Sequence, residues 1–321
     1  MQGKFVDRAD VHEHIMYHVQ KLRNGRSYMT RRVDAKQGDT VLFSVSMSFQ
    51  LREPNEPTYF VPSPKVVNLD DFQSLSKDLY DPYVSLRQVV HPEQCMHAHM
   101  RYHNILHSMR EDHPMYELLS QWTHDHTHVF PMQSRPAIPT MFDRDGHMAP
   151  FSKTAYWLSS RGYCRGPQSL QQAMLGFHVD QFFLVNMNTE IPSYTTTMMA
   201  SLDHTMWFYN DFQMCDWLLF VLDNQALNNG RALITGRIYR LDGVLVAVVV
   251  RFFALTLLGA RGRAPFQAQP VAFIDMLRVE NRTPPWDLMI SVLDYVPSYP
   301  EFCVRCCLLY TSPSPRDGLL S

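Results

Sequence analysis

A segment that is apolar around nearly its whole circumference constrains the fold of this chain more than any other feature. Residues 171–187 read QQAMLGFHVDQFFLVNM. At helical spacing the apolar side chains cover most of the surface: Met174, Leu175, Val179, Phe182, Phe183 and Val185. This pattern predicts a helix over residues 168–185 that is buried on almost every side, so other elements must wrap around it.

Strand-like segments flank this helix in the sequence. They lie at residues 155–163 before it and at 195–209, 216–226, 231–241 and 244–250 after it. Asn229-Gly230 and Asp242-Gly243 separate successive segments and indicate tight turns. One buried helix followed by an antiparallel meander predicts an α+β unit in which the sheet wraps the helix.

Residues 14–51 predict a separate three-strand meander. The alternating segments HIMYHVQKL, SYMTRRVDA and TVLFSVSMSFQ are separated by Asn24-Gly25 and by a Gln-Gly-Asp turn at residues 37–39. A sheet this small needs an element laid across one face, and residues 1–13 show no helical pattern. We therefore expect the first unit to be incomplete.

The other segments have weaker patterns. Residues 53–130 contain prolines, many His and Met residues and short helix-like pieces such as 69–80, which is typical of a linker or an insertion. The character changes again after Val250, and the ending CLLYTSPSPRD is similar to translated vector or adaptor sequence. The expected parts are a partial first unit (1–52), a linker (53–130), a second unit (131–255) and a tail (256–321), artefactual at 307–321.

Composition excludes several classes of function. The net charge of -2 offers no basic surface for nucleic acid or an anionic membrane. The longest apolar run, residues 244–258, is interrupted by Arg251 and is too short to span a bilayer. No signal-peptide pattern opens the chain, and the six cysteines form no regular framework, so we expect an intracellular protein.

Three groups of side chains have the residue types of a metal site. His99, His103 and His107 recur every fourth residue, and His124, His126 and His128 alternate. No carboxylate or cysteine pair accompanies them in a known motif, so the sequence favours a solvated face over a metal site. The cluster Cys303, Cys306 and Cys307 lacks a second ligand pair, and zinc is not expected there.

Asp180 is the one carboxylate within the apolar segment. A buried charge is costly, so Asp180 has either partners or a chemical role.

Two stretches resemble the acyl-CoA thioesterase II family. LRNGRSYMTRRVDAKQGDTVLFSVSMSFQ (22–50) is similar to the pattern of the first unit of that family. ASLDHTMWFYNDFQMCDWLLF and GRIYRLDGVLVA, within 200–247, are similar to the Ser/Thr-Ile/Leu-Asp-His-Ser/Thr-Met-Trp-Phe and Asp-Gly-Val-Leu-Val-Ala segments of the second. The resemblance implies a double hot-dog fold, in which each antiparallel sheet wraps one helix, with the beginning of the first hot-dog unit missing.

The resemblance also implies hydrolysis of acyl-CoA thioesters by a water that three side chains hold. The Asp of the family matches Asp180, and its Ser or Thr matches Ser201. Its Gln falls on Arg251, which is a departure from the family pattern. In the family, the residues that match Asp203 and His204 are not among the three that hold the water. We expect this pair to support the sheet through hydrogen bonds.

The chemistry also follows from the residue types. A thioester carbonyl can be attacked by a positioned water, which needs a base, a second hydrogen-bond partner and a polarising donor. Asp180 can serve as the base and Ser201 can hold the water, because a hydroxyl both donates and accepts. Arg251 can only donate and stays charged, so contact with Asp180 would stabilise the carboxylate and weaken it as a base.

Three readings of the chain stay open. It is an acyl-CoA thioesterase with Asp180, Ser201 and Arg251 in its site, or a non-catalytic acyl-CoA-binding or assembly member of the same fold, or a misassembled gene model. Arg251 has two explanations. It is an evolved replacement of the family glutamine, or it marks the start of an intron read-through or a reading-frame error. No cofactor or metal is implied, and coenzyme A enters as part of the substrate. Family members form homo-oligomers, and eukaryotic ones are often peroxisomal, so the expected compartment is the peroxisome or the cytoplasm.

Overall fold

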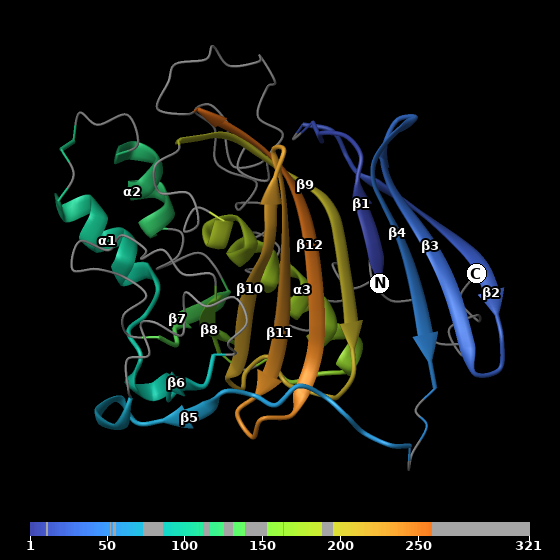
Figure 1. Cartoon of the computed structure of the whole chain (residues 1–321). Coiled ribbons are helices and arrows are strands. Elements are labelled where there is room, and N and C mark those ends of the chain that lie inside the picture. Colours follow the sequence, from blue (N-terminus) through green and yellow to red (C-terminus); the bar gives the residue numbers. More distant parts are fainter. Residues whose placement is uncertain are drawn as a thin grey trace.

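The computed structural model describes residues 1–10, 12–51, 53, 56–72, 86–108, 110–111, 116–124, 131–138, 153–162, 164–187 and 195–258. Its dominant element is a ten-stranded antiparallel sheet with the strand order β2-β3-β4-β1-β9-β12-β11-β10-β8-β7 (Figure 1). Of the predicted tail (256–321), residues 256–258 are instead part of a strand of the sheet, and residues 259–321, with the cysteine cluster, lie outside the described residues.

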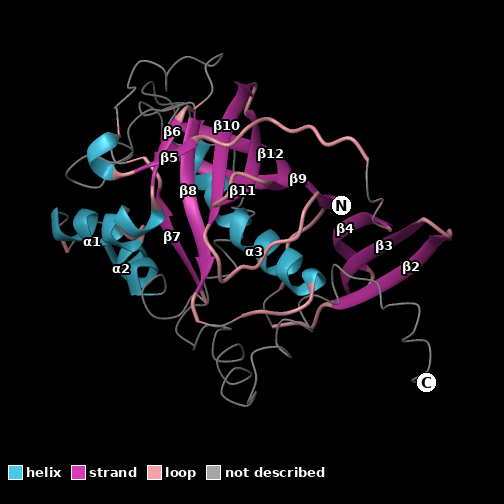
Figure 2. Ribbon diagram, turned by 90° about the horizontal axis from the view of Figure 1, so that it is seen from below, coloured by secondary structure: helices cyan, strands magenta, loops and turns pink. Residues whose placement is uncertain are grey.

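The second unit has one long helix and the strands that surround it. The helix α3 spans Gln168–Met187. The strands are β7 (Met132–Pro136), β8 (Lys153–Ser160), β9 (Thr195–Phe208), β10 (Leu218–Asn228), β11 (Arg231–Arg240) and β12 (Leu245–Leu258). Figure 2 shows α3 lying across one face of the curved sheet, where it packs on β9 and β10. The predicted helix and the meander that follows it are confirmed.

The burial of α3 explains why its sequence is apolar on so many sides. Leu175, Val179 and Phe183 are fully buried, and Met174 and Phe182 are nearly so. These side chains pack with those of β8 to β12 in one core that holds most of the buried apolar residues of the described chain. Burial of a side chain of this size contributes about 1.5–3 kcal/mol, so the helix is held mainly by this packing.

The turn between β10 and β11 has the geometry that its sequence predicts. Asn229 and Gly230 are the two residues between the strands, and both have positive φ, 50° and 66°. This is the backbone of a two-residue type I′ turn, which Asn-Gly favours because glycine adopts positive φ without steric cost. The next predicted turn also contains a left-handed glycine, Gly243 with φ 84°.

The first unit has four strands, one more than the sequence pattern indicated. They are β1 (Gln2–Phe5), β2 (Met16–Asn24), β3 (Tyr28–Gln37) and β4 (Thr40–Gln50). The β2–β4 meander is confirmed. Strand β1 was not anticipated because its four residues are too few to show alternation. It pairs with β4 on one side and β9 on the other, and thus joins the two units into one sheet.

The described part of the first unit is a sheet without a helix of its own. Its small core consists of Val33, Val45 and Met47, and β2 is exposed along its whole length. In Figure 2 no described helix crosses β2, β3 and β4. Two antiparallel sheets joined edge to edge, one of them wrapped around a central helix, form the predicted double hot-dog architecture of the α+β class.

The connecting region has short elements, as expected, and one pairing that was not expected. Strands β5 (Lys65–Val67) and β6 (Gln88–Val90) form a parallel two-stranded sheet. The helices are η1 (Leu69–Asp71), η2 (Pro92–Gln94), α1 (His99–Ser108) and α2 (Tyr116–His124). The predicted helical piece at 69–80 begins as η1, and residues 73–80 lie outside the described chain. No helix of the described chain is long and apolar enough to cross a membrane.

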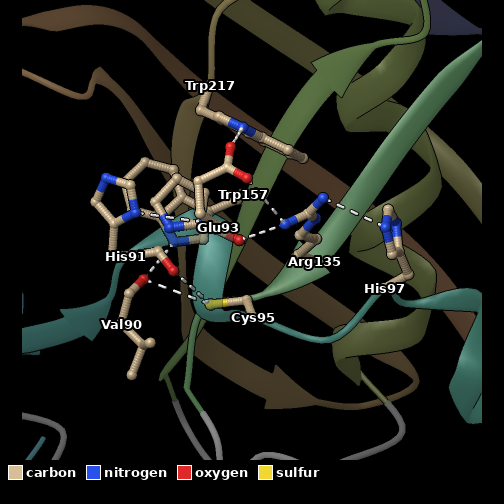
Figure 3. A network of polar contacts seen from close by, with 9 residues as sticks. Val90, His91, Glu93, Cys95, His97, Arg135, Trp157 and Trp217 are labelled. Carbon is tan, nitrogen blue, oxygen red and sulfur yellow. Dashed lines mark hydrogen bonds and ion pairs between the residues drawn. The ribbon is translucent and has the colours of Figure 1, made fainter. Parts of the chain in front are cut away.

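A polar network ties this region to the second unit (Figure 3). Arg135 of β7 donates to the carbonyl of Pro92 at 2.6 Å and lies over the ring of Trp217. The Trp217 indole donates to Glu93 at 3.0 Å, and the Trp157 indole donates to the carbonyl of Val90 at 2.7 Å. Residues 90–93 are therefore anchored to the sheet next to its β7 edge.

Candidate active site

The structure brings the three candidate residues of the sequence into contact. Asp180 comes from α3, Ser201 from β9 and Arg251 from β12. Nη1 of Arg251 forms an ion pair with Oδ1 of Asp180, and Nη2 donates a hydrogen bond to Oγ of Ser201 at 2.6 Å. The guanidinium therefore joins the carboxylate and the hydroxyl that were expected to hold a water.

A β-bulge brings Ser201 to this site. In the ladder between β9 and β12, Arg251 lies opposite His204 and Phe253 lies opposite Ser201, so Leu202 is the extra residue. Two residues apart on β12, Arg251 and Phe253 point to the same face. Without the bulge, Ser201 and His204, three residues apart, would point to opposite faces. The extra residue turns Ser201 to the face that packs on α3.

Arg251 is one of the most deeply buried charged residues of the described chain, with 2% of its side chain exposed, whereas Asp180 keeps 20%. The rings of Phe5, Phe183 and Phe253 lie 5.3, 5.7 and 5.4 Å from the guanidinium carbon. Cation–π contacts and the ion pair together offset part of the desolvation of this charge. Asp180 is therefore the more exposed partner of the pair.

The three aromatic rings around Arg251 were not predicted as site residues. The sequence pattern assigned Phe183 only to the buried surface of the predicted helix. Phe253 follows Val250, after which the predicted strand pattern ends. Phe5 comes from the unpredicted strand β1, so the first unit contributes to the site of the second. Their role depends on tertiary packing, for which the sequence gives no local signal.

Asp203 and His204 do not form a dyad, because neighbouring residues in a strand face opposite sides. Asp203 forms an ion pair with Lys4 of β1, which supports the sheet as expected. His204 is buried on the helix-facing side, and its ring lies 6.4 Å from that of Phe183. Its Nδ1 has no hydrogen-bond partner among the described residues, so the expectation that His204 is hydrogen-bonded is wrong for this atom. Burial lowers the pKa of His204 to about 4, which keeps the imidazole neutral.

His99, His103 and His107 lie on the helix α1, which spans His99–Ser108, and His124 is the last residue of α2. Among the residues that the structure describes, no three His, Cys, Asp or Glu side chains are placed to hold a metal ion. His126, His128 and the cysteines at 303, 306 and 307 lie outside those residues.

Comparison with known proteins identifies the family. Residues 1–50 match the family model of the acyl-CoA thioesterase N-terminal domain, and residues 110–252 match that of the acyl-CoA thioesterase C-terminal domain. The chain belongs to the acyl-CoA thioesterase II family. Asp180, Ser201 and Arg251 all lie within the matched C-terminal domain.

Curated relatives of the family include acyl-coenzyme A thioesterase 8 of Mus musculus and of Homo sapiens. The mouse protein is 25% identical over 243 residues, which cover 75% of this chain and 67% of the relative. The human protein is 26% identical over 252 residues, with the same coverage. These relatives agree with the family that the two domain models identify.

Solved structures of the family share the fold. The acyl-CoA thioesterase II TesB2 of Mycobacterium marinum matches with a TM-score of 0.54 at 23% identity, over 80% of this chain and 79% of that one. The tesB protein of Mycobacterium avium subspecies paratuberculosis matches with a TM-score of 0.54 at 16% identity, over 79% and 77%. Strand β12 continues past Arg251 in register with β9 as far as Leu258, six residues beyond the end of the family match.

Proposed function

We propose that this thioesterase family member hydrolyses acyl-CoA thioesters to a free fatty acid and coenzyme A. The observation that carries the proposal is the convergence of Asp180, Ser201 and position 251 at one point between α3 and the sheet. A carboxylate, a hydroxyl and a donor in contact are the groups that a positioned water needs to attack a thioester.

In the proposed reaction, Asp180 takes a proton from a water that Ser201 holds. The water oxygen forms a bond to the acyl carbon, and the carbonyl oxygen gains negative charge. The C–S bond then breaks, and the thiolate of coenzyme A leaves with the proton that Asp180 returns. No covalent intermediate with the protein is required, because a thioester carbonyl is already activated.

Arg251 has two opposing effects on this reaction. Its guanidinium can donate to the developing oxyanion, which stabilises the transition state. It also holds Asp180 and Ser201 in the resting structure, and an opposite charge in contact with a carboxylate stabilises the ionised form and weakens the base. We therefore expect turnover that is slower than with a glutamine amide at position 251, because an amide both donates and accepts.

The same ion pair favours a second candidate function, acyl-CoA binding without hydrolysis. If the guanidinium does not leave Asp180 when substrate enters, the carboxylate has no room to contact a water. The protein would then keep the acyl-CoA groove of its fold and serve as a binding or assembly module.

Release of the coenzyme A thiol, followed with a chromogenic disulfide reagent over acyl chains of several lengths, tests the proposal. Loss of release in Asp180→Asn, with acyl-CoA binding retained in calorimetry, supports hydrolysis at this site. Binding of acyl-CoA without thiol release by both the parent chain and Arg251→Gln supports the second function instead.

A further inference from the structure

We propose that His204 is a further catalytic residue of this site, whose ring Nδ1 hydrogen-bonds the water that attacks the thioester. The inference rests on the proposed hydrolysis. It adds a fourth residue to the three, Asp180, Ser201 and Arg251, that the resemblance to the family places at the site. It starts from the position of His204 directly opposite Arg251 in the β9–β12 ladder.

The ladder places the imidazole on the same face as the other site residues. His204 and Arg251 are register partners, so their side chains leave the sheet side by side toward α3. The bulge at Leu202 brings Ser201 to that face as well. The helix contributes Asp180 to the same side, and Phe183, three residues further on, lies against both the His204 ring and the guanidinium.

The hydrogen bonding of His204 points to a ligand. Nδ1 is buried, and no described group pairs with it. Buried polar atoms in native proteins are nearly always paired, with protein or with an ordered water. The carboxylate that sequence places next to it, Asp203, is on the opposite face with Lys4, so it does not occupy the ring.

The surroundings also suit a neutral donor and acceptor. Opposite His204 on β1 stands Gly3, which has no side chain, and the ring of Phe43 occupies the place that a Cβ there would take. With Phe183 on the other side, these apolar groups favour the uncharged form of the imidazole, and so does the positive charge of the Met1 amino group. A neutral imidazole has one nitrogen that donates a hydrogen bond and one that accepts. The Arg251 guanidinium can only donate.

These properties define the role. Arg251 supplies positive charge for the oxyanion but cannot accept a hydrogen bond, and Asp180 is the proton acceptor. Once the guanidinium has moved off Asp180 and a water has taken its place, His204 fixes the orientation of that water, as an amide would at position 251. Its contribution should therefore be large when position 251 is arginine and small when it is glutamine.

A double-mutant cycle on the full chain tests this dependence. His204→Leu removes the ring nitrogens, and His204→Asn is the matched control, because its amide reaches the position of Nδ1. In the parent chain we expect His204→Leu to lower kcat by roughly 100-fold with little change in KM, and His204→Asn to keep most of the activity. In the Arg251→Gln background the loss from His204→Leu should shrink to a few-fold. Equal losses in the two backgrounds, or equal losses for Leu and Asn, would show a structural role and overturn the inference.

A spectroscopic readout separates this inference from the proposed hydrolysis. The probe is an acyl-CoA ketone analogue in which CH₂ replaces the sulfur, and the measurement is the ¹⁵N shift of the His204 ring at neutral pH. A change at Nδ1 on addition of the analogue, absent in His204→Asn, supports a ring that contacts the reacting groups even if turnover is too slow to measure. An unchanged Nδ1 signal overturns the inference and leaves the proposed hydrolysis standing wherever thiol release is observed.

Discussion

Arg251 of β12 and Asp180 of α3 form an ion pair that joins the sheet to its central helix, and the buried partner is the arginine. The acidic residue that looked anomalous in an apolar helix is therefore paired. Its partner, Arg251, stands where the resemblance to the family leads us to expect a glutamine, so we propose that the same contact stabilises the fold and limits the chemistry.

The unequal burial of the pair predicts unequal effects on stability. Asp180→Ala leaves an almost fully buried guanidinium without its counter-ion, and we expect a loss of about 3–5 kcal/mol in the free energy of unfolding. Arg251→Gln leaves a carboxylate that is 20% exposed and can be hydrated, so the loss should be smaller. Urea unfolding of both single variants and the double variant measures the coupling. Equal losses for the two single variants would contradict the unequal burial.

His204 predicts a pH dependence of stability. Burial lowers its pKa to about 4, below the ordinary value of 6.5, so between these values the unfolded chain binds more protons than the folded one. Stability should therefore fall as pH falls from about 6.5 to 4, by an amount on the order of 3 kcal/mol. His204→Asn should remove this slope, whereas substitution of the exposed His18 should leave it unchanged. The check is the free energy of unfolding at several pH values, and a parent chain without this slope would contradict the burial of the imidazole.

Two glutamines near the start of α3 offer a matched pair of substitutions. Gln171 is fully buried, accepts from the Met214 amide at 2.7 Å and donates to the Cys164 carbonyl at 2.8 Å. Gln168 makes the same kind of two-sided bond to the backbone of Phe212 but is half-buried. Gln171→Leu should cost about 1–3 kcal/mol for each backbone group left unpaired, and Gln168→Leu clearly less, because water can replace its bonds. Thermal unfolding compares the two, and a larger loss for Gln168→Leu would contradict their relative burial.

The sequence predicted the helix and the meanders, which the structure confirms, and it singled out three residues that the structure brings into contact, because each leaves a local signal or belongs to the family resemblance. The helix α3 and the Asn229-Gly230 turn are determined by residues that lie close together in the sequence, so the apolar pattern and the turn propensity are enough to predict them. The bulge at Leu202 could not be predicted, because one strand alone does not show which residue its partner strand skips. The position of β1 between the two units, and with it the contact of Phe5 with Arg251, depends on pairing across about 200 residues of sequence.

The central claim is that Asp180 activates a water and that Arg251 restrains it. The most direct test is kcat for thiol release by Arg251→Gln, compared with the parent chain and with Asp180→Asn/Arg251→Gln. The account predicts that Arg251→Gln raises kcat by roughly tenfold or more, and that adding Asp180→Asn removes this activity by at least about 100-fold. An Arg251→Gln protein that is folded and binds acyl-CoA but is no faster than the parent, or whose activity survives the loss of Asp180, would contradict it.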